Sequence, residues 1–117
     1  MLTLQPSIRI HVCLRPADMR KSIDGLSAMA RSEAEGDPLS GHLFLFRNRR
    51  GDRLKVLYWD RNGFALWYKR LEKGRFSFPE PGSGRIGISE SEFQLLVGGL
   101  SLARVWNRQE KSAEISV

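Results

Sequence analysis

Four short apolar runs, joined by connectors of only a few residues, are the feature that most limits how this chain can fold. The runs are HLFLFRN (42–48), DRLKVLYWD (52–60), FALWYKRL (64–71) and RFSF (75–78). Between the second and third runs stands Asn62-Gly63, the strongest short hairpin signal, because both central residues of a type I′ turn need positive φ. The four runs therefore predict an antiparallel β-meander.

Apolar side chains fall on both faces of this predicted meander. Leu54 and Val56 lie on one face of their run, whereas Leu57 and Trp59 lie on the other. Strands of this kind are covered on both sides. We expect a helix on one face, and a second helix, a partner or a ligand on the other.

The segments before the meander predict one strand and one helix. Residues 7–14 alternate between apolar and polar side chains, which is the period of a half-buried strand. Over 18–34, Met19, Ile23 and Leu26 recur at helical spacing, and Asp18 is a reasonable N-cap. Gly25 lowers the helix propensity inside this pattern by about 1 kcal/mol relative to Ala.

A second, shorter helix is predicted after a proline-containing turn at 78–84. Ser89 and Glu92 have capping-box spacing, and apolar residues follow at helical intervals until Gly98-Gly99. Together these signals predict a single α+β domain over 1–102: a meander of about five strands with an N-terminal and a short C-terminal helix. Residues 103–117 show little periodicity and are expected to be an irregular or frayed tail.

Positive charge is concentrated in the meander. The chain has a net charge of +6, but residues 47–75 alone carry +7, so the remainder sums to −1. The ten cations are Arg47, Arg49, Arg50, Arg53, Lys55, Arg61, Lys69, Arg70, Lys73 and Arg75. Alternate turns of a meander lie at the same edge, so we expect the turns at 49–52 and 72–74 to form one basic patch that binds phosphate. Edge strands also carry cations against aggregation, but with lower charge density.

Four aromatic residues interleave with these cations: Tyr58, Trp59, Trp67 and Tyr68. Such side chains can stack on nucleic-acid bases or dock on a protein. Aromatic residues in strands are more often core residues, and we expect that for most of these four.

Signals for a metal, a cofactor or a nucleophile are weak. His11, Cys13 and His42 are too few for an ordinary zinc site, and a single cysteine excludes an intrachain disulfide. The glycines of 82–87 match no phosphate-binding loop and are interpreted as a turn. A two-metal nuclease site would need Asp18, Asp24, Asp52 and Asp60, each of which has a simpler role as a helix, cap or turn residue. We expect no catalytic residue, metal or cofactor.

The N-terminal sequence has no signal-length apolar run, and no stretch approaches the roughly 18 apolar residues of a membrane span. We therefore expect a cytoplasmic protein.

Two separated motifs carry a resemblance to a known family. DMRKSIDGL (18–26) and FRNRRGDRLKVLYWDRNGFALWYKRLEKGRF (46–76) occur in order and at the usual spacing. With these motifs, most of residues 8–100 closely resembles the small accessory proteins (TnpB) encoded by the second open reading frame of the insertion-sequence-66 family of bacterial transposable elements. These are unrelated to the RNA-guided nuclease of the same name.

The resemblance implies a role in transposition beside a separate DDE-type transposase. Three functions are compatible with it. The first is a non-catalytic factor that binds element DNA through residues 47–75, with Arg20 and Lys21 as contributors. The second is a protein adapter that docks on the transposase or on another copy through Trp59 and Trp67. The third, ranked last, is a nuclease. The oligomeric state and the DNA site stay open.

Overall fold

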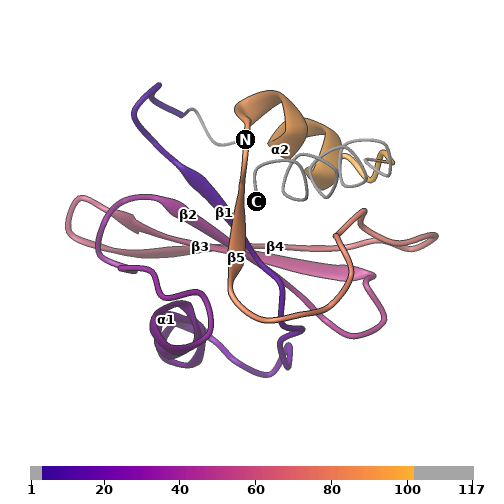
Figure 1. The fold of residues 1–117 in the computed structure, drawn as a ribbon, viewed down its shortest axis with the longest axis horizontal. Helices are drawn as coiled ribbons and strands as arrows, with labels where there is room; N and C mark the ends of the chain where they lie inside the picture. Colours follow the sequence, from indigo (N-terminus) through magenta and orange to yellow (C-terminus); the bar gives the residue numbers. More distant parts are fainter. Residues whose placement is uncertain (1–3, 102–117) are drawn as a thin grey trace, which may run out of the picture.

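A five-stranded sheet with one helix on each face makes up the structure (Figure 1), a computed structural model that describes residues 4–101. The strands are β1 (Ile10–Cys13), β2 (Leu43–Arg47), β3 (Arg53–Asp60), β4 (Gly63–Arg70) and β5 (Arg85–Ile88). Helix α1 (Ile23–Ser32) follows β1, and helix α2 (Glu90–Val97) follows β5. The predicted α+β class is confirmed.

The sheet is mixed, with strand order β4-β3-β2-β1-β5. Strands β2, β3 and β4 form the predicted antiparallel meander, but β1 pairs with β2 in parallel. The prediction of an all-antiparallel meander of about five strands was therefore wrong beyond these three. The reason is the segment containing α1, which is long enough to return the chain to the end of the sheet at which β1 begins, so that β2 runs in the same direction as β1.

The fifth strand lies elsewhere than predicted. Residues 75–78 form no strand, although Phe76 is buried and its N–H donates to the Gly51 carbonyl at 2.8 Å. Instead β5, which overlaps the segment interpreted as a glycine turn, pairs antiparallel with β1. A strand of four residues that includes an arginine and a glycine carries almost no β-propensity signal.

Each face of the sheet has its own apolar core. The α2 side buries Leu43, Leu45, Leu54 and Val56 from the strands against Phe93 and Leu96 from the helix. On the α1 side, Phe44, Phe46 and Leu57 pack against Leu26, Met29 and Ala30. Alternate residues of the central strand β2 serve the two cores, so the prediction that both faces are covered is confirmed, with α2 as the second cover.

Helix α1 begins at Ile23, later than predicted, and Asp18 is not its N-cap. The Asp18 side chain instead accepts the N–H of Arg20 at 2.9 Å and bonds the Arg20 guanidinium, which closes a local turn. Gly25 lies close to this turn, since a Cβ there would meet the Lys21 stem at 3.2 Å. The first strand is also shorter than the predicted 7–14.

Helix α2 follows its sequence signals closely. The Ser89 hydroxyl accepts the Glu92 N–H at 3.1 Å, and the Glu92 carboxylate accepts the Ser89 N–H at 2.8 Å. This is the predicted capping box, and Gly98 is the C-cap residue, as predicted.

The β3–β4 hairpin forms where predicted, but its loop is shifted by one residue. Asp60 pairs with Gly63, so the two loop residues are Arg61 and Asn62. Of these only Arg61 has positive φ (53°), which does not match the predicted type I′ turn.

None of the helices in residues 4–101 is long and apolar enough to cross a membrane. The predicted tail, 103–117, lies outside the described residues.

Candidate nucleic-acid interface

The turn between β2 and β3 is held by its own side chains. The Asn48 amide donates to the Asp52 carboxylate at 2.7 Å, and its carbonyl oxygen accepts the Arg53 N–H at 3.0 Å. The first of these bonds lowers the pKa of Asp52 below its usual value. Gly51 takes the left-handed conformation (φ 78°) that lets the chain reverse here. The turn therefore has a fixed shape, and its two exposed residues are Arg49 and Arg50.

The segment 16–21, between β1 and α1, is fixed beside this turn. The Ala17 N–H donates to the Arg47 carbonyl at 2.8 Å, at the end of β2. The Lys55 ammonium, from β3, donates to the carbonyls of Met19 at 2.9 Å and Lys21 at 2.8 Å. Two segments that are distant in sequence are thus held next to each other.

Between the two segments is a hollow of about 680 Å³, which we call the basic groove. Its lining residues are Pro16, Ala17, Asp18, Met19, Arg20, Lys21, Asn48, Arg49, Arg50 and Arg53. Five of them are cations and one is a carboxylate. The groove is therefore suited to an anionic ligand.

The carboxylate is already paired within the groove. Arg20 donates to both oxygens of Asp18, the shortest contact being 2.6 Å, and these bonds lower the pKa of Asp18 from 3.8 to about 2. Within residues 4–101, Lys21, Arg49, Arg50 and Arg53 take part in no ion pair. These four charges are available to a ligand.

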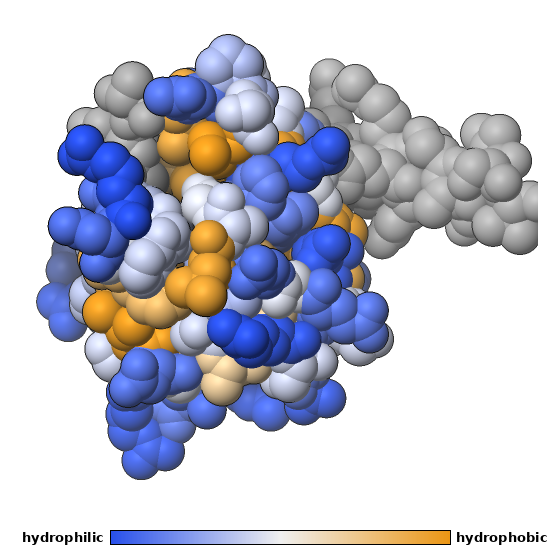
Figure 2. All heavy atoms as spheres, turned by 90° about the vertical axis from the view of Figure 1, so that its left-hand side faces the viewer, coloured by the Kyte–Doolittle hydropathy of each residue, from blue (hydrophilic) through white to orange (hydrophobic). Residues whose placement is uncertain are grey.

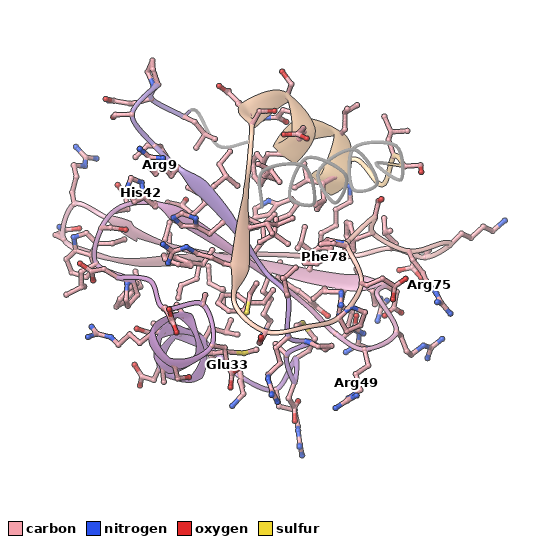
Figure 3. All side chains as sticks on the ribbon, viewed as in Figure 1. Arg9, Glu33, His42, Arg49, Arg75 and Phe78 are labelled. Atoms are coloured by element: carbon pink, nitrogen blue, oxygen red, sulfur yellow. The ribbon has the colours of Figure 1, made fainter. Side chains whose placement is uncertain are left out.

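The predicted meeting of the turns at 49–52 and 72–74 is confirmed. The Leu71 N–H donates to the Asp52 carbonyl at 2.8 Å, and the Arg75 stem packs over Gly51. Lys73 and Arg75 are exposed on this second turn. Figure 3 shows Arg49 and Arg75 extending on the same side of the molecule, away from Arg9 and His42.

The other predicted cations lie away from the groove or are engaged within the fold. Arg47 is only 5% exposed and lies over the Phe78 ring, 5.3 Å from its centre, and burial lowers its pKa. The Lys69 ammonium donates to the Val97 carbonyl at 2.8 Å. Arg70 pairs with Glu72 at 3.1 Å.

Arg61 lies at the opposite end of β3, in the β3–β4 loop, with its side chain 92% exposed. On that side of the molecule, Figure 2 shows small apolar patches separated by hydrophilic side chains.

Of the four interleaved aromatics, three are partly buried. Tyr58 and Trp67 lie on the α2-side core, and Trp59 contacts Phe64 edge to face at 5.1 Å. Tyr68 differs, being 48% exposed.

Within the described part of the chain, no three His, Cys, Asp or Glu side chains gather as a metal site would require. Cys13 is buried in the α1-side core. His11 lies against His42 and Phe44, and burial, followed by the charge of Arg85, lowers its pKa from 6.5 to about 4.

The sequence-based interpretation missed three roles around the groove. Asn48 holds the turn, Asp18 neutralises Arg20, and Lys55 fixes the 16–21 segment. A signal was present for the first, because Asn four residues before Asp, with Gly between them, is turn chemistry. The Lys55 contacts have no local signal, since they join residues 34 and 36 positions apart.

The comparisons with known proteins give one family and two similar proteins. Residues 8–107 match the family described as IS66 Orf2 like protein. The chain is similar to two uncharacterized proteins of Sinorhizobium fredii. It is 42% identical to y4jC over 104 residues, which cover 89% of each chain. It is 35% identical to y4hO over 100 residues, which cover 86% of this chain and 87% of that protein. No solved structure matches it significantly.

Proposed function

Because the chain belongs to the family of IS66 Orf2-like proteins, we propose that it is a non-catalytic accessory factor for DNA transposition that binds nucleic acid through the basic groove. One observation carries the proposal. Four unpaired cations from two separate segments converge on one hollow whose shape is fixed by internal hydrogen bonds. The DNA of the element and its DDE-type transposase are the proposed partners.

Phosphate is the anion that best suits these groups. Arginine presents a planar set of donors that bonds two phosphate oxygens at once, and Arg49, Arg50 and Arg53 supply three of them. Lys73 and Arg75 on the adjoining turn extend the positive surface beyond the groove. A linear polyanion can contact both parts, whereas a single small anion fills only one.

We divide the ten cations of 47–75 into those whose charged groups are free to contact a ligand and those that are engaged within the fold or lie elsewhere. We assign the direct contacts to Arg49, Arg50, Arg53, Lys73 and Arg75, joined by Lys21 from the other segment, where the Arg20 guanidinium is already bonded to Asp18. Arg47, Lys55 and Lys69 act by holding the fold in this assignment, because their charged groups are buried or bonded to backbone carbonyls. The remaining two are Arg70, which pairs with Glu72, and Arg61, which lies in the β3–β4 loop away from the groove.

The salt dependence of binding tests the proposal. With four or five phosphates contacted, log K should fall against log salt with a slope of about −4 on duplex DNA. The double variant Arg49→Ala/Arg50→Ala should reduce the slope to about −2 and weaken binding. Fluorescence anisotropy with a labelled duplex measures both.

The matched control is Arg9→Ala/Arg61→Ala, which removes the same charge from exposed positions on the side of the molecule away from the groove. It should leave the slope almost unchanged. Equal effects of the two double variants would mean that net charge, not the groove, determines binding. No binding of the wild type at low salt would remove the nucleic-acid function.

The alternative is an adapter that docks on the transposase without touching DNA. Its support is the exposed apolar pair Leu95 and Leu100, on α2 and just beyond it. The sheet face with Trp67 is less suited, because α2 covers that side. A pull-down with transposase in nuclease-treated extract distinguishes the adapter, which keeps its partner there, from a factor that joins the complex through DNA.

A further inference from the structure

Tyr68 is the one member of the aromatic set in the meander that presents much of its ring to solvent. It lies on β4, which is an edge strand of the sheet, and 48% of the residue is exposed. Its neighbours on the same face, Phe64 and Leu66, are packed against the α1-side core. The core therefore does not account for an aromatic side chain at this position.

The ring is held in place from one side. The Lys55 ammonium lies 5.4 Å from the centre of the Tyr68 ring, and the two residues face each other in the β3–β4 register. The same ammonium donates to the carbonyls of Met19 and Lys21, two residues that line the basic groove. One charged group thus contacts both the tyrosine ring and the wall of the groove.

The groove cations continue up to this ring. Arg53, which lines the groove, lies opposite Arg70 in the β3–β4 register. Tyr68, two residues before Arg70, is therefore the diagonal neighbour of Arg53 on the same face of the sheet. Diagonal neighbours lie about 7–8 Å apart. A phosphate at Arg53 and a base at Tyr68 can therefore belong to the same nucleotide or to adjacent ones.

We propose that this surface takes single-stranded nucleic acid, with backbone phosphates in the basic groove and an unpaired base stacked on the free face of Tyr68. The inference deepens the proposed function and rests on it. Inside a duplex the faces of the bases are covered by their neighbours, so an aromatic ring can stack only on a base that is unpaired or displaced. An exposed aromatic ring beside a cationic groove has the two parts that single-strand sites combine.

The volume of the groove agrees with such a ligand. At about 680 Å³ it lies inside the range of about 300–1,000 Å³ that holds ligands larger than one phosphate ion. In this proposal a sugar with its phosphate occupies the groove, and the base extends toward β4.

The experiment compares three labelled oligonucleotides of about 12 nucleotides, a length inside the usual site sizes of about 4–16 nucleotides. They are oligothymidine, a duplex of mixed sequence, and a single strand in which the bases are replaced by abasic residues. Anisotropy titrations use the full chain and its variants Tyr68→Leu and Tyr68→Phe. We expect Tyr68→Leu to weaken oligothymidine binding about tenfold, which is the size of one base–aromatic stack.

The controls separate stacking from charge and from folding. Tyr68→Phe keeps the ring and should stay within about twofold of the wild type, and Tyr68→Leu should leave duplex binding unchanged. The abasic strand keeps every phosphate, so it should bind the wild type about as weakly as oligothymidine binds Tyr68→Leu. The abasic strand is tested on the unaltered protein, so it shows whether a base stacks on the chain even if a Tyr68 variant folds poorly.

Two failures have different meanings. If the wild type binds duplex and oligothymidine through Arg49 and Arg50, but the abasic strand and Tyr68→Leu change nothing, the stacking proposal is overturned and the proposed function stands. If the wild type binds none of the three probes at low salt, both are overturned.

Discussion

The two turns at the ends of β3 carry the same kinds of residue but differ in how they are held. The Asn48 side chain closes the β2–β3 turn by donating to the Asp52 carboxylate and accepting the Arg53 N–H, and Gly51 lies against the Arg75 stem. The β3–β4 loop has Arg61 and Asn62 exposed, and a Cβ at Gly63 would meet nothing within 4 Å. Arg49 and Arg50 therefore extend from a turn whose backbone is braced, whereas the Arg61 side chain is 92% exposed and pairs with its neighbour Asp60, at 3.7 Å. The comparison shows that the bonds and contacts around a turn, more than the number of arginines on it, decide which residues are candidates for ligand contacts.

The largest expected effect on stability comes from removing the side chain that holds the first turn. Asn48→Ala deletes two hydrogen bonds, one of them to a carboxylate, and should lower the free energy of unfolding by about 2 kcal/mol. Asn62→Ala, in the other loop, should change it by less than about 0.5 kcal/mol. Urea unfolding midpoints measure both. Equal losses would erase the contrast between the turns.

A smaller contrast is expected from the glycines. Gly51 has φ 78°, where an alanine side chain is strained, so Gly51→Ala should cost about 1 kcal/mol although its surroundings have room for a methyl group. Gly63 lacks positive φ and lies in open space, so Gly63→Ala should be neutral or slightly stabilising. Thermal unfolding of the two variants side by side tests this. A destabilised Gly63→Ala would show that the second loop is more constrained than its contacts indicate.

The smallest effect concerns protonation at the groove. Asp18 has its pKa lowered to about 2 by Arg20, so the folded state binds its proton less readily than the unfolded chain. The stabilising pair is therefore fully present above about pH 4 and is lost as the pH falls toward 2. Arg20→Gln should return the Asp18 pKa toward 3.8, measured by carbon NMR of the carboxyl group. An unchanged pKa in this variant would mean that Arg20 does not hold the carboxylate in solution.

Much of the fold follows from local patterns that act over a few residues. The apolar alternation of 52–60 and 64–71, the capping box at Ser89 and the shared edge of two turns were all predicted, because each depends on near neighbours. Strand β5 was not, since its pairing with β1 joins residues more than 70 positions apart. Parallel pairing of β1 with β2 has the same cause, as the long connection through α1 leaves no turn signal to read.

The candidate site was predictable as a region but not as a set of contacts. The alternation of side chains along a strand does not predict that Arg47 is buried against Phe78 or that Lys55 bonds the 16–21 segment. Both facts depend on where loops far along the chain come to lie. The motif at 18–26 was visible in the sequence, and only the tertiary fold reveals that it faces the turn at 48–53.

The basic groove has two walls that come from distant parts of the chain. Ligand binding in the groove is therefore linked to folding. An unfolded or truncated chain has the same arginines but no groove, because residues 16–21 reach the turn only once β1, α1 and β2 have assembled. A ligand that needs both walls selects the folded state and stabilises it by mass action. At a hundred times its dissociation constant such a ligand adds about 2.7 kcal/mol to the free energy of unfolding. If the groove binds such a ligand, resistance of the chain to proteolysis would report occupancy of the groove.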